Sequence, residues 1–519
     1  MQFSKLSPSG DSTTAGGRDR ATSVALAALC TLLFLTFLDN TVVSVALGSL
    51  QTSLHASVAE LQWVIGAYAL TFASIMLACG MIGDELGRKK VMLSGAGVFC
   101  AGSVLCALAP NAQVLIAGRA IMGLGAAASE PGTLSVLRHI YTDERERARA
   151  IGVWAAVSGL ALAMGPVIGG AIVGAWNWRG IFWFNLAFGL AALIVAAIVV
   201  PESADPTAAR VDSVGTVLGA GALATLVFGI IDAETSSFGA TVPVTLFCVA
   251  VVLAVAFIWW EHRASNPLLN PRLFRLPLFA VPNVVAFCTY FATFAIFFFT
   301  ALYLVEVIGD SGFKIALIFA PMTVLMIVSS VFAGYWTGRA GPRWPITIGS
   351  ALFGAGLLLA DPLIVSHPNY LLLGLCLALA GIGIGITVVP VTSAVLNAVP
   401  PDRSGMAASS ANTSREVGAV TGVAVLGALV FSQINSSLTT HLVQLGVPIG
   451  YKTLILEFIE TGQVVGVNVN NYKSDPIVGK VIGAAYGAFG DGVHVAIYVS
   501  AGLMLFAALL AAVTLRKES

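Results

Sequence analysis

Between two apolar segments near the start of the chain lies the run Gly80-Met81-Ile82-Gly83-Asp84-Glu85-Leu86-Gly87-Arg88-Lys89-Lys90. Its glycines allow two helix ends to approach each other closely in a tight turn. Asp84 is placed to accept hydrogen bonds from the amide groups at a helix terminus, or from an arginine. The basic residues that follow predict a loop on the cytoplasmic face of a membrane. The alternative interpretation is an ordinary basic cytoplasmic loop without a specific structural role.

The composition around this loop predicts a protein that crosses a membrane many times. The chain has 519 residues, of which 57 % are hydrophobic and 10 % are charged, and its mean hydropathy is +0.91. No soluble protein of this length has such a composition. The formal net charge of zero gives no sign of a nucleic-acid partner, and we expect none. All seven cysteines lie in apolar segments, so we expect no disulfide, no metal site and no cofactor.

Apolar runs separated by glycine, proline and charge predict fourteen transmembrane helices, and an all-α membrane protein. The first six form an N-terminal bundle (residues 21–200), at 21–47, 59–79, 91–109, 112–135, 148–173 and 179–200. Two inserted helices, at 213–231 and 241–260, lie with their linkers in residues 201–277. The last six form a C-terminal bundle (278–515), at 278–305, 313–337, 345–365, 370–398, 405–432 and 491–515.

The distribution of lysine and arginine predicts that both termini are cytoplasmic. Of the 26 such residues, 19 lie in the tails (1–20 and 516–519) and in the loops that share their side. The N-terminal tail lacks a cleavage pattern, so the first apolar segment is expected to remain as a helix. We therefore expect a multi-pass protein of the cell (plasma or inner) membrane, and a monomer.

Short internal similarities predict two related bundles, as in many transporters. Pro131 lies twelve residues before Asp143, and Pro390 lies twelve residues before Asp402. The run 334–344 also matches 80–90, although it lacks the acidic residue. A long external loop is expected at 433–490, with a hairpin at 454–469 and a short amphipathic helix at 477–489, because long loops without any structure are uncommon.

Two charged residues lie inside predicted spans of the first bundle. Asp39 of span one and Arg119 of span four are each about 11 Å from the external end of their span, at 1.5 Å per residue. Buried charges face a bundle interior and have partners, so we expect these two to pair. One interpretation is a purely structural salt bridge. The other is a carboxylate for which protons and substrate compete.

Three further ionisable residues are candidates for coupling or for substrate binding. Glu130 follows Arg119 by eleven residues, so both project from one face of a helix. Glu130 is therefore a second candidate coupling acid, and the alternative is a residue near the cytoplasmic boundary beside Arg138. Arg415 and Glu416 in span thirteen are the polar candidates of the second bundle. Because they are adjacent, they point to different faces and are poorly placed to neutralise each other.

Span five contains the run Ser158-Gly159-Leu160-Ala161-Leu162-Ala163-Met164-Gly165-Pro166-Val167-Ile168-Gly169-Gly170. Taken alone, such a stripe of small residues permits close helix packing, and Pro166 bends the helix. Together with the 80–90 loop and the Arg119 span, it resembles the antiporter motif of the fourteen-helix drug:proton antiporter family, within the major facilitator superfamily. The resemblance extends from Leu32 to Leu515. Four residues differ from those usual in the family at their positions: Gly83, Glu85, Met122 and Glu416.

The resemblance implies roles for two groups of residues. Asp84, with Gly80, Gly87 and Arg88, is expected to latch the two bundles in the outward-open state. The antiporter helix is expected to seal the cavity in the inward-facing state, which favours export; its motif residues are Gly159, Gly165, Pro166, Gly169 and Gly170. The function implied is proton-coupled efflux of small organic compounds, such as drugs, antibiotics or lipophilic cations, by alternating access.

Other functions remain open at this point. They are a narrow-substrate metabolite exporter, a uniporter or importer of a small solute on the same fold, and a sensor without flux. A membrane enzyme or an ATP-driven pump is not expected, because no phosphate-binding Gly-x-x-x-x-Gly-Lys-Ser/Thr loop occurs. The expected partners are a small-molecule substrate, protons and the lipid bilayer.

Overall fold

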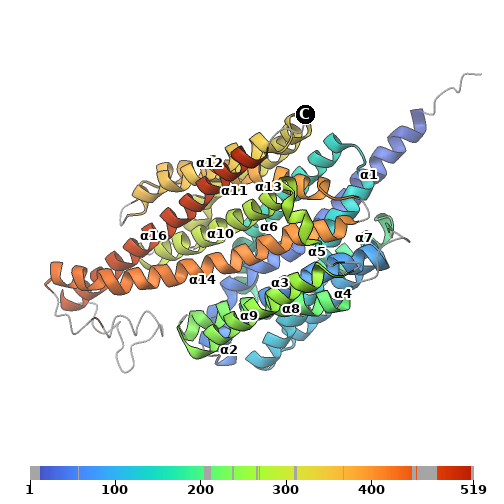
Figure 1. Cartoon of the computed structure of the whole chain (residues 1–519). Helices are drawn as coiled ribbons and strands as arrows, with labels where there is room; N and C mark the ends of the chain where they lie inside the picture. The colour runs from blue at the N-terminus through green and yellow to red at the C-terminus, as the bar shows by residue number, and fades with distance from the viewer. Residues whose placement is uncertain are drawn as a thin grey trace, which may run out of the picture.

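In the computed structural model the chain is a bundle of long helices, and the described residues contain no strand (Figure 1). The structure describes residues 12–56, 58–203, 212–236, 239–264, 267, 269–308, 312–365, 368–400, 403–446, 452 and 476–515. The predicted all-α class is thereby confirmed. The first half contains α1 (Ser12–Val42), the 3-10 turn η1 (Val43–Ala46), α2 (Leu47–Leu54), α3 (Val58–Leu86), α4 (Arg88–Ala107), α5 (Ala112–Ile140), α6 (Glu144–Ala175) and α7 (Arg179–Val199).

The second half follows an inserted helical hairpin. The hairpin consists of α8 (Ser213–Ser236) and α9 (Thr241–Glu261). The second half contains η2 (Pro271–Arg275), α10 (Pro277–Glu306), α11 (Gly312–Ala340), α12 (Arg343–Ala360), η3 (Asp361–Leu363), α13 (Tyr370–Asn397), α14 (Ser404–Gln444) and α16 (Pro476–Thr514). Twelve of the described helices are long and apolar enough to cross a membrane. The other two predicted spans, 148–173 and 278–305, coincide with α6 and α10, and the count of fourteen stays a prediction.

Helices extend into the segment 433–490 from both of its ends, and its place outside the membrane stays a prediction. Helix α14 continues to Gln444, and the short helix expected at 477–489 is the first part of the 39-residue α16. The reason is tertiary packing, because α14 and α16 run side by side to a common end (Figure 1) and bury Leu438, Leu442, Ala484 and Ala488 completely. The hairpin expected at 454–469 lies outside the described residues.

The two halves meet mainly where α6 packs against α11 and α3 packs against α14, and α5 also contacts α14 and α6 also contacts α13. The inserted hairpin lies over α3, where Trp63 contacts the ring of Phe228 with centroids 5.0 Å apart, and α8 also touches α14. We call the end of the bundle where α1 begins and α16 ends the terminal end, and the opposite end the far end.

The loops at 80–90 and 334–344 both turn at a glycine with a positive φ, in line with their sequence similarity. Gly87 and Gly341 both adopt a positive φ, of 110° and 74°, which favours glycine. In each copy the helix before the loop approaches the other half, Gly80 at α14 and Gly334 at α6. A Cβ on Gly338, which stands in the place of Asp84, would lie 3.0 Å from the Cα of Arg145. A side chain at this position of the second copy would therefore require Arg145 to move by a few tenths of an ångström.

Helices α4 and α5 cross at two glycines. A Cβ on Gly95 would lie 2.6 Å from the carbonyl oxygen of Gly125, and a Cβ on Gly125 would lie 2.4 Å from the backbone nitrogen of Phe99. Contacts this close exist only between backbones that carry no side chain, as is common where membrane helices pack. The crossing places α5, and with it Arg119 and Glu130, against α3 and α4.

We expect Gly125→Leu to destabilise the protein by about 2–3 kcal/mol or more, because the new side chain forces α4 and α5 apart. The measurement is the melting temperature of the purified protein in detergent. Gly502→Leu is the matched control, because nothing lies within 4 Å of a Cβ on Gly502. Equal melting temperatures for the two variants would show that the crossing is not tightly packed.

Candidate transport site

Asp39 of α1 and Arg119 of α5 form an ion pair inside the first half, as the sequence predicts. The Nη1 of Arg119 donates to Oδ2 of Asp39, and its Nε donates to the carbonyl oxygen of Val64 over 3.0 Å. Asn185 of α7 donates from Nδ2 to the other carboxylate oxygen of Asp39 over 2.6 Å. The guanidinium lies 4.5 Å from the ring centre of Tyr68. Asp39 and Asn185 are each 0 % exposed, and Arg119 is 1 % exposed.

Both carboxylate oxygens of Asp39 therefore have donors, and this cluster joins α1, α3, α5 and α7. Sequence analysis did not select Asn185 or Tyr68. A signal for Asn185 existed, because it lies six residues after the start of α7, and Arg119 lies seven residues after the start of α5. Both helices start at the far end, so the two polar residues have the same depth.

Glu130 of α5 lies in a second buried centre, between the two halves. Helix α5 packs against α14, and the charges that act on Glu130 are those of Glu416 and Arg415. Glu130 is 2 % exposed, and none of the described residues hydrogen-bonds to its Oε2. Arg138, the neighbour considered from the sequence, instead donates to the carbonyl oxygen of Val399 over 2.7 Å.

Arg119 and Glu130 share a face of α5, as their spacing predicts, but they serve different centres. Tyr68 of α3 is within electrostatic range of both. Arg119 bonds to partners in the first half. The one helix face that the sequence predicts for both residues therefore contributes to two separate clusters, each with its own arginine.

Arg415 of α14 is held by neutral groups. Its Nη1 donates to Oδ1 of Asn412 over 2.8 Å, and its Nη2 donates to Oγ1 of Thr392. Its guanidinium lies 5.4 Å from the ring centre of Trp154 on α6 and 5.6 Å from that of Tyr290 on α10. Within the described part of the chain it forms no salt bridge with Glu416, as expected for adjacent residues.

Two hydrogen bonds connect the indole ring of Trp154 to the backbone of Glu130. The indole Nε1 of Trp154 donates to Oγ1 of Thr133 over 3.1 Å, and that hydroxyl donates to the carbonyl oxygen of Glu130 over 2.7 Å. Trp154 thus contacts Arg415 of one half and the Glu130 turn of the other. Sequence analysis missed Trp154, because an apolar helix with a tryptophan carries no sign of its partner.

At the terminal end, Asp84 joins α3 to the opposite half. Its carboxylate accepts from the backbone N–H of Gly405 over 3.0 Å and from that of Met406 over 3.1 Å, in the first turn of α14. Arg88 donates to the same carboxylate over 2.8 Å. The N-cap residue of α14, Arg403, makes no side-chain cap, so Asp84 caps a helix of the other half. A Cβ on Gly80 would lie 2.5 Å from the carbonyl oxygen of Gly405, so only glycine permits this approach.

A second set of contacts at the terminal end holds the end of α13. Besides the bond from Arg138 to Val399, Arg147 of α6 donates to Oδ1 of Asn397 over 2.7 Å. The amide of Asn397 in turn donates to Glu144 over 3.0 Å. Arginine suits the negative end of a helix as aspartate suits the positive end. The turn between α13 and α14 is therefore held at both helix ends, and the terminal end is closed.

The small residues of α6 face helices of both halves. A Cβ on Gly165 would lie 3.0 Å from the backbone nitrogen of Val42, and one on Gly169 would lie 2.8 Å from the Val42 carbonyl oxygen. A Cβ on Gly159 would collide with Met326 of α11. Pro166 lies within α6, and Gly170 is exposed. The antiporter helix therefore packs on α1 of its own half and on α11 of the other.

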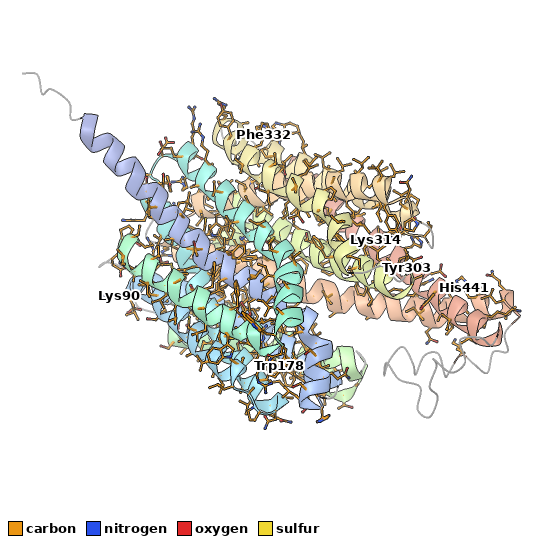
Figure 2. All side chains as sticks on the ribbon, turned by 180° about the vertical axis from the view of Figure 1, so that it is seen from behind. Lys90, Trp178, Tyr303, Lys314, Phe332 and His441 are labelled. Atoms are coloured by element: carbon orange, nitrogen blue, oxygen red, sulfur yellow. The ribbon has the colours of Figure 1, made fainter. Side chains whose placement is uncertain are left out.

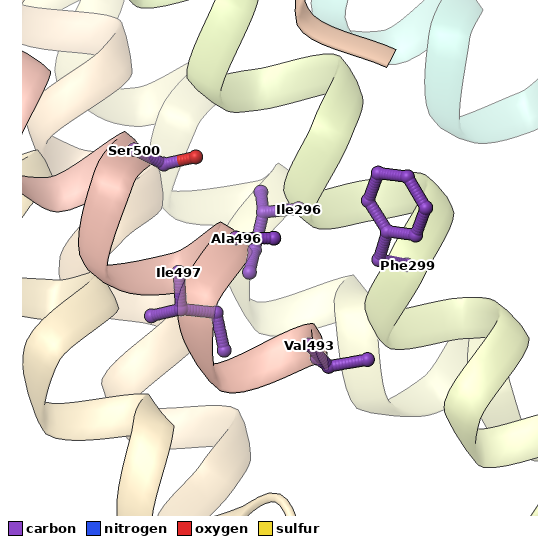
Figure 3. Close-up of a pocket in the computed structure, with 6 residues that line it drawn as sticks. All are labelled: Ile296, Phe299, Val493, Ala496, Ile497 and Ser500. Atoms are coloured by element: carbon purple, nitrogen blue, oxygen red, sulfur yellow. The ribbon is translucent and has the colours of Figure 1, made fainter. Parts of the chain in front are cut away.

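Figure 2 shows the side chains from behind, with Lys90 towards the terminal end of the first half and Trp178 towards its far end. A small pocket between α10 and α16 is lined by Ile296, Phe299, Val493, Ala496, Ile497 and Ser500 (Figure 3). Ser500 is its one polar lining residue, and both helices belong to the second half. None of its lining residues belongs to the charged centre around Glu130.

Comparison with known proteins identifies relatives of the whole architecture. The family model of the Major Facilitator Superfamily matches residues 29–423. Multidrug resistance protein Stp of Mycobacterium tuberculosis (strain CDC 1551 / Oshkosh) is 32 % identical over 410 residues, which cover 79 % of this chain and 76 % of that protein. Methylenomycin A resistance protein of Streptomyces coelicolor is 34 % identical over 417 residues, covering 80 % of this chain and 87 % of that protein.

Solved structures show the same fold. The human organic anion transporter MFSD10 (TETRAN) superimposes with a TM-score of 0.61 and 14 % identity, covering 95 % of this chain and 99 % of that one. The proton:xylose symporter XylE, bound to 6-bromo-6-deoxy-D-glucose, gives a TM-score of 0.60 at 14 % identity, covering 95 % of each chain.

Proposed function

The chain belongs to the major facilitator superfamily, and on that premise we propose that it exports small organic compounds across the cell membrane in exchange for protons. The names of its relatives support the substrate class, because they are multidrug and antibiotic resistance proteins. We propose that it moves its substrate chemically unchanged, as a monomer in the bilayer. The lysine and arginine distribution supports an orientation with the terminal end in the cytoplasm.

The observation that carries this proposal is the carboxylate of Glu130, buried between the halves with one oxygen that no described residue hydrogen-bonds. An isolated charged carboxylate is costly to bury in a membrane protein, so such a group holds a proton or a cation. A group at the boundary between the halves is also the one that alternating access exposes to each side in turn. Glu130 is therefore the proposed coupling acid.

The sequence left two roles open for Asp39, a structural salt bridge and a carboxylate for which protons and substrate compete. We propose the structural role. Both oxygens of Asp39 are bonded, and Arg119 supplies a counter-charge. Its cluster fixes α1, α3, α5 and α7 relative to one another, so that the first half moves as one body. We propose that Asp39, Arg119 and Asn185 position the half that carries Glu130, and do not exchange protons themselves.

The closed terminal end corresponds in this proposal to the outward-facing state. To load substrate from the cytoplasm, the halves must part at the terminal end. That movement breaks the bonds from Asp84 to α14 and from Arg138 to α13. The small residues of α6 let its backbone lie close to α11 of the other half, where the two halves move relative to each other.

The test is efflux of a fluorescent lipophilic cation from proteoliposomes with an imposed pH gradient. We expect the native protein to show gradient-driven efflux, and Glu130→Gln to fall to the rate of protein-free vesicles. Glu60→Gln is the control, since Glu60 lies at the far end and bonds to Gln113 over 2.7 Å. Gradient-driven efflux that persists in Glu130→Gln would remove Glu130 from the mechanism. No efflux by the native protein would favour a narrow-substrate exporter or a sensor.

A further inference from the structure

Arginines gather at the terminal end, where α6 of the first half meets α11 of the second. Arg145 and Arg149 lie in the first two turns of α6, and Arg339 lies in the last turn of α11. All three are exposed, and none takes part in the salt bridges formed within the described part of the chain. Positive charges gathered in this way attract an anion.

One tyrosine brings two of these arginines, from different halves, close together. The guanidinium carbon of Arg149 lies 5.1 Å from the ring centre of Tyr335 on α11, and that of Arg339 lies 3.7 Å from the same ring centre. The two cations are therefore no further apart than the sum of these distances. Guanidinium groups bind phosphate through paired N–H···O bonds, and the several oxygens of one phosphate group can accept from both arginines. We call Arg149 and Arg339 the clamp arginines.

The close packing of two backbones holds the clamp arginines in position. A Cβ on Gly334 of α11 would lie 2.4 Å from the carbonyl oxygen of Ala148 and 3.1 Å from the Cα of Arg149. Because no side chain separates the helices here, Arg149 leaves α6 directly beside Tyr335. Parting of the halves at the terminal end would separate Arg149 from Arg339, so both can bind one group only while this end is closed.

The surface beside the clamp arginines is apolar and lies on the outside of the bundle. The exposed fractions are 59 % for Val328, 45 % for Val331 and 58 % for Phe332 on α11, and 37 % for Val153 on α6. Phe332 lies at the outer edge of the second half in Figure 2. Since the terminal end is closed, exposed side chains near it face the bilayer and not a cavity. We call these four residues the apolar stripe.

Aromatic residues place the clamp arginines at the boundary of the membrane. Tyr335 is 39 % exposed, and Trp344, in the first turn of α12, is 51 % exposed. Tyrosine and tryptophan are enriched where the hydrocarbon meets the lipid headgroups. The clamp arginines therefore lie at the depth of the lipid phosphates, and the apolar stripe lies at the depth of the acyl chains.

We propose that Arg149 and Arg339 bind the phosphate group of one anionic phospholipid, whose acyl chains lie along the apolar stripe. The apolar stripe favours a lipid over free phosphate, because it offers the chains a surface directly below the arginines. In the orientation proposed above, this lipid belongs to the cytoplasmic leaflet, whose anionic lipids attract arginine. One phosphate bound by both halves stabilises the closed terminal end. The inference goes beyond the proposed function and does not depend on the compound that is transported.

The first test counts the molecules of dioleoylphosphatidylglycerol that the purified full-length protein retains in detergent, by native mass spectrometry. We expect one tightly retained lipid in the native protein. Arg149→Gln and Arg339→Gln should each weaken its binding about 5-fold, and the double variant about 25-fold, because each arginine contributes separately to the attraction of an anionic lipid. Arg149→Lys keeps the charge and should retain most of the binding. Dioleoylphosphatidylcholine, which has no net charge, should bind the native protein no better than phosphatidylglycerol binds the double variant.

Arg263→Gln is the matched control. Arg263 is also exposed and also contacts an aromatic ring, that of Trp259 over 4.0 Å, but that ring belongs to the same inserted hairpin and not to the other half. Its loss should leave the retention of phosphatidylglycerol unchanged. The melting temperature without added lipid shows whether each variant is folded.

Three results would overturn the lipid clamp. If the native protein retains two lipids and each single variant loses only one of them, the arginines belong to separate sites. If Arg263→Gln weakens retention as much as the clamp variants do, the attraction is general to the basic surface. If inorganic phosphate displaces the lipid, the site binds a soluble anion.

The second test measures the effect of the lipid on the closed state. Spin labels at positions 90 and 513, at the terminal ends of α4 and α16, report the separation of the halves in nanodiscs. With phosphatidylglycerol present, we expect Arg149→Gln/Arg339→Gln to show a larger share of the long distance than the native protein. In phosphatidylcholine alone the two proteins should agree. Equal shares in both lipids would show that the lipid does not stabilise the closed terminal end.

Discussion

Arg119→Leu is expected to destabilise the protein by about 3–5 kcal/mol, because it leaves the Asp39 carboxylate buried without a counter-charge. Arg119 is 1 % exposed, and it also holds the carbonyl oxygen of Val64 and the ring of Tyr68. The measurement is the free energy of unfolding in mixed micelles, or the melting temperature in detergent. Arg263→Leu is the control, because Arg263 is exposed and contacts the ring of Trp259.

The double variant Asp39→Leu/Arg119→Leu makes this prediction specific to charge. Two apolar side chains of similar volume commonly replace a buried ion pair at little cost. We therefore expect the double variant to recover most of the lost stability, while its transport falls because Asn185 has lost its acceptor. A double variant as unstable as the sum of the two single changes would show that packing, and not the unpaired charge, causes the loss.

Asp84→Ala is expected to shift the protein towards the state that is open at the terminal end. The change removes two charge-assisted hydrogen bonds to α14, worth together about 3–6 kcal/mol, or roughly 10²- to 10⁴-fold in the equilibrium between the two states. Spin labels at positions 90 and 340, on α4 and α11, report the separation of the halves at this end. We expect the short distance to dominate in the native protein and the long distance to dominate in Asp84→Ala.

Asp143→Ala is the matched control for the latch. Asp143 also caps a helix, accepting from the backbone N–H groups of Arg145 and Glu146 over 3.0 Å each, but that helix is α6, which follows it directly in the same half. Loss of this cap should cost stability and leave the distance between the labels unchanged. If both variants open the terminal end equally, the bond from Asp84 to α14 of the other half does not specifically stabilise the closed state.

The sequence alone was sufficient for the features that depend on neighbours along the chain. Hydropathy over about 20 residues identifies a span wherever it lies, and glycine at positions 87 and 341 signals the same turn twice. The pairing of Asp39 with Arg119 was also predictable, because equal depth in two neighbouring spans and opposite charge leave few alternatives. The sequence predicted the close packing of α6 as well, because small residues allow helix backbones to approach each other.

Only the tertiary structure decided which helices those residues meet. Asp84 and Gly405 are 321 residues apart, and Glu130 and Glu416 are 286 residues apart, so no local pattern relates them. Helices α14 and α16 likewise extend past their apolar runs because each covers the other. A buried charge acquires its role from the groups that face it, and these depend on the rotation and contact of helices that belong to different halves. For this reason the sequence named Glu130 as a candidate acid, and the packing of α5 on α14 gave it Glu416 and Arg415 as its partners.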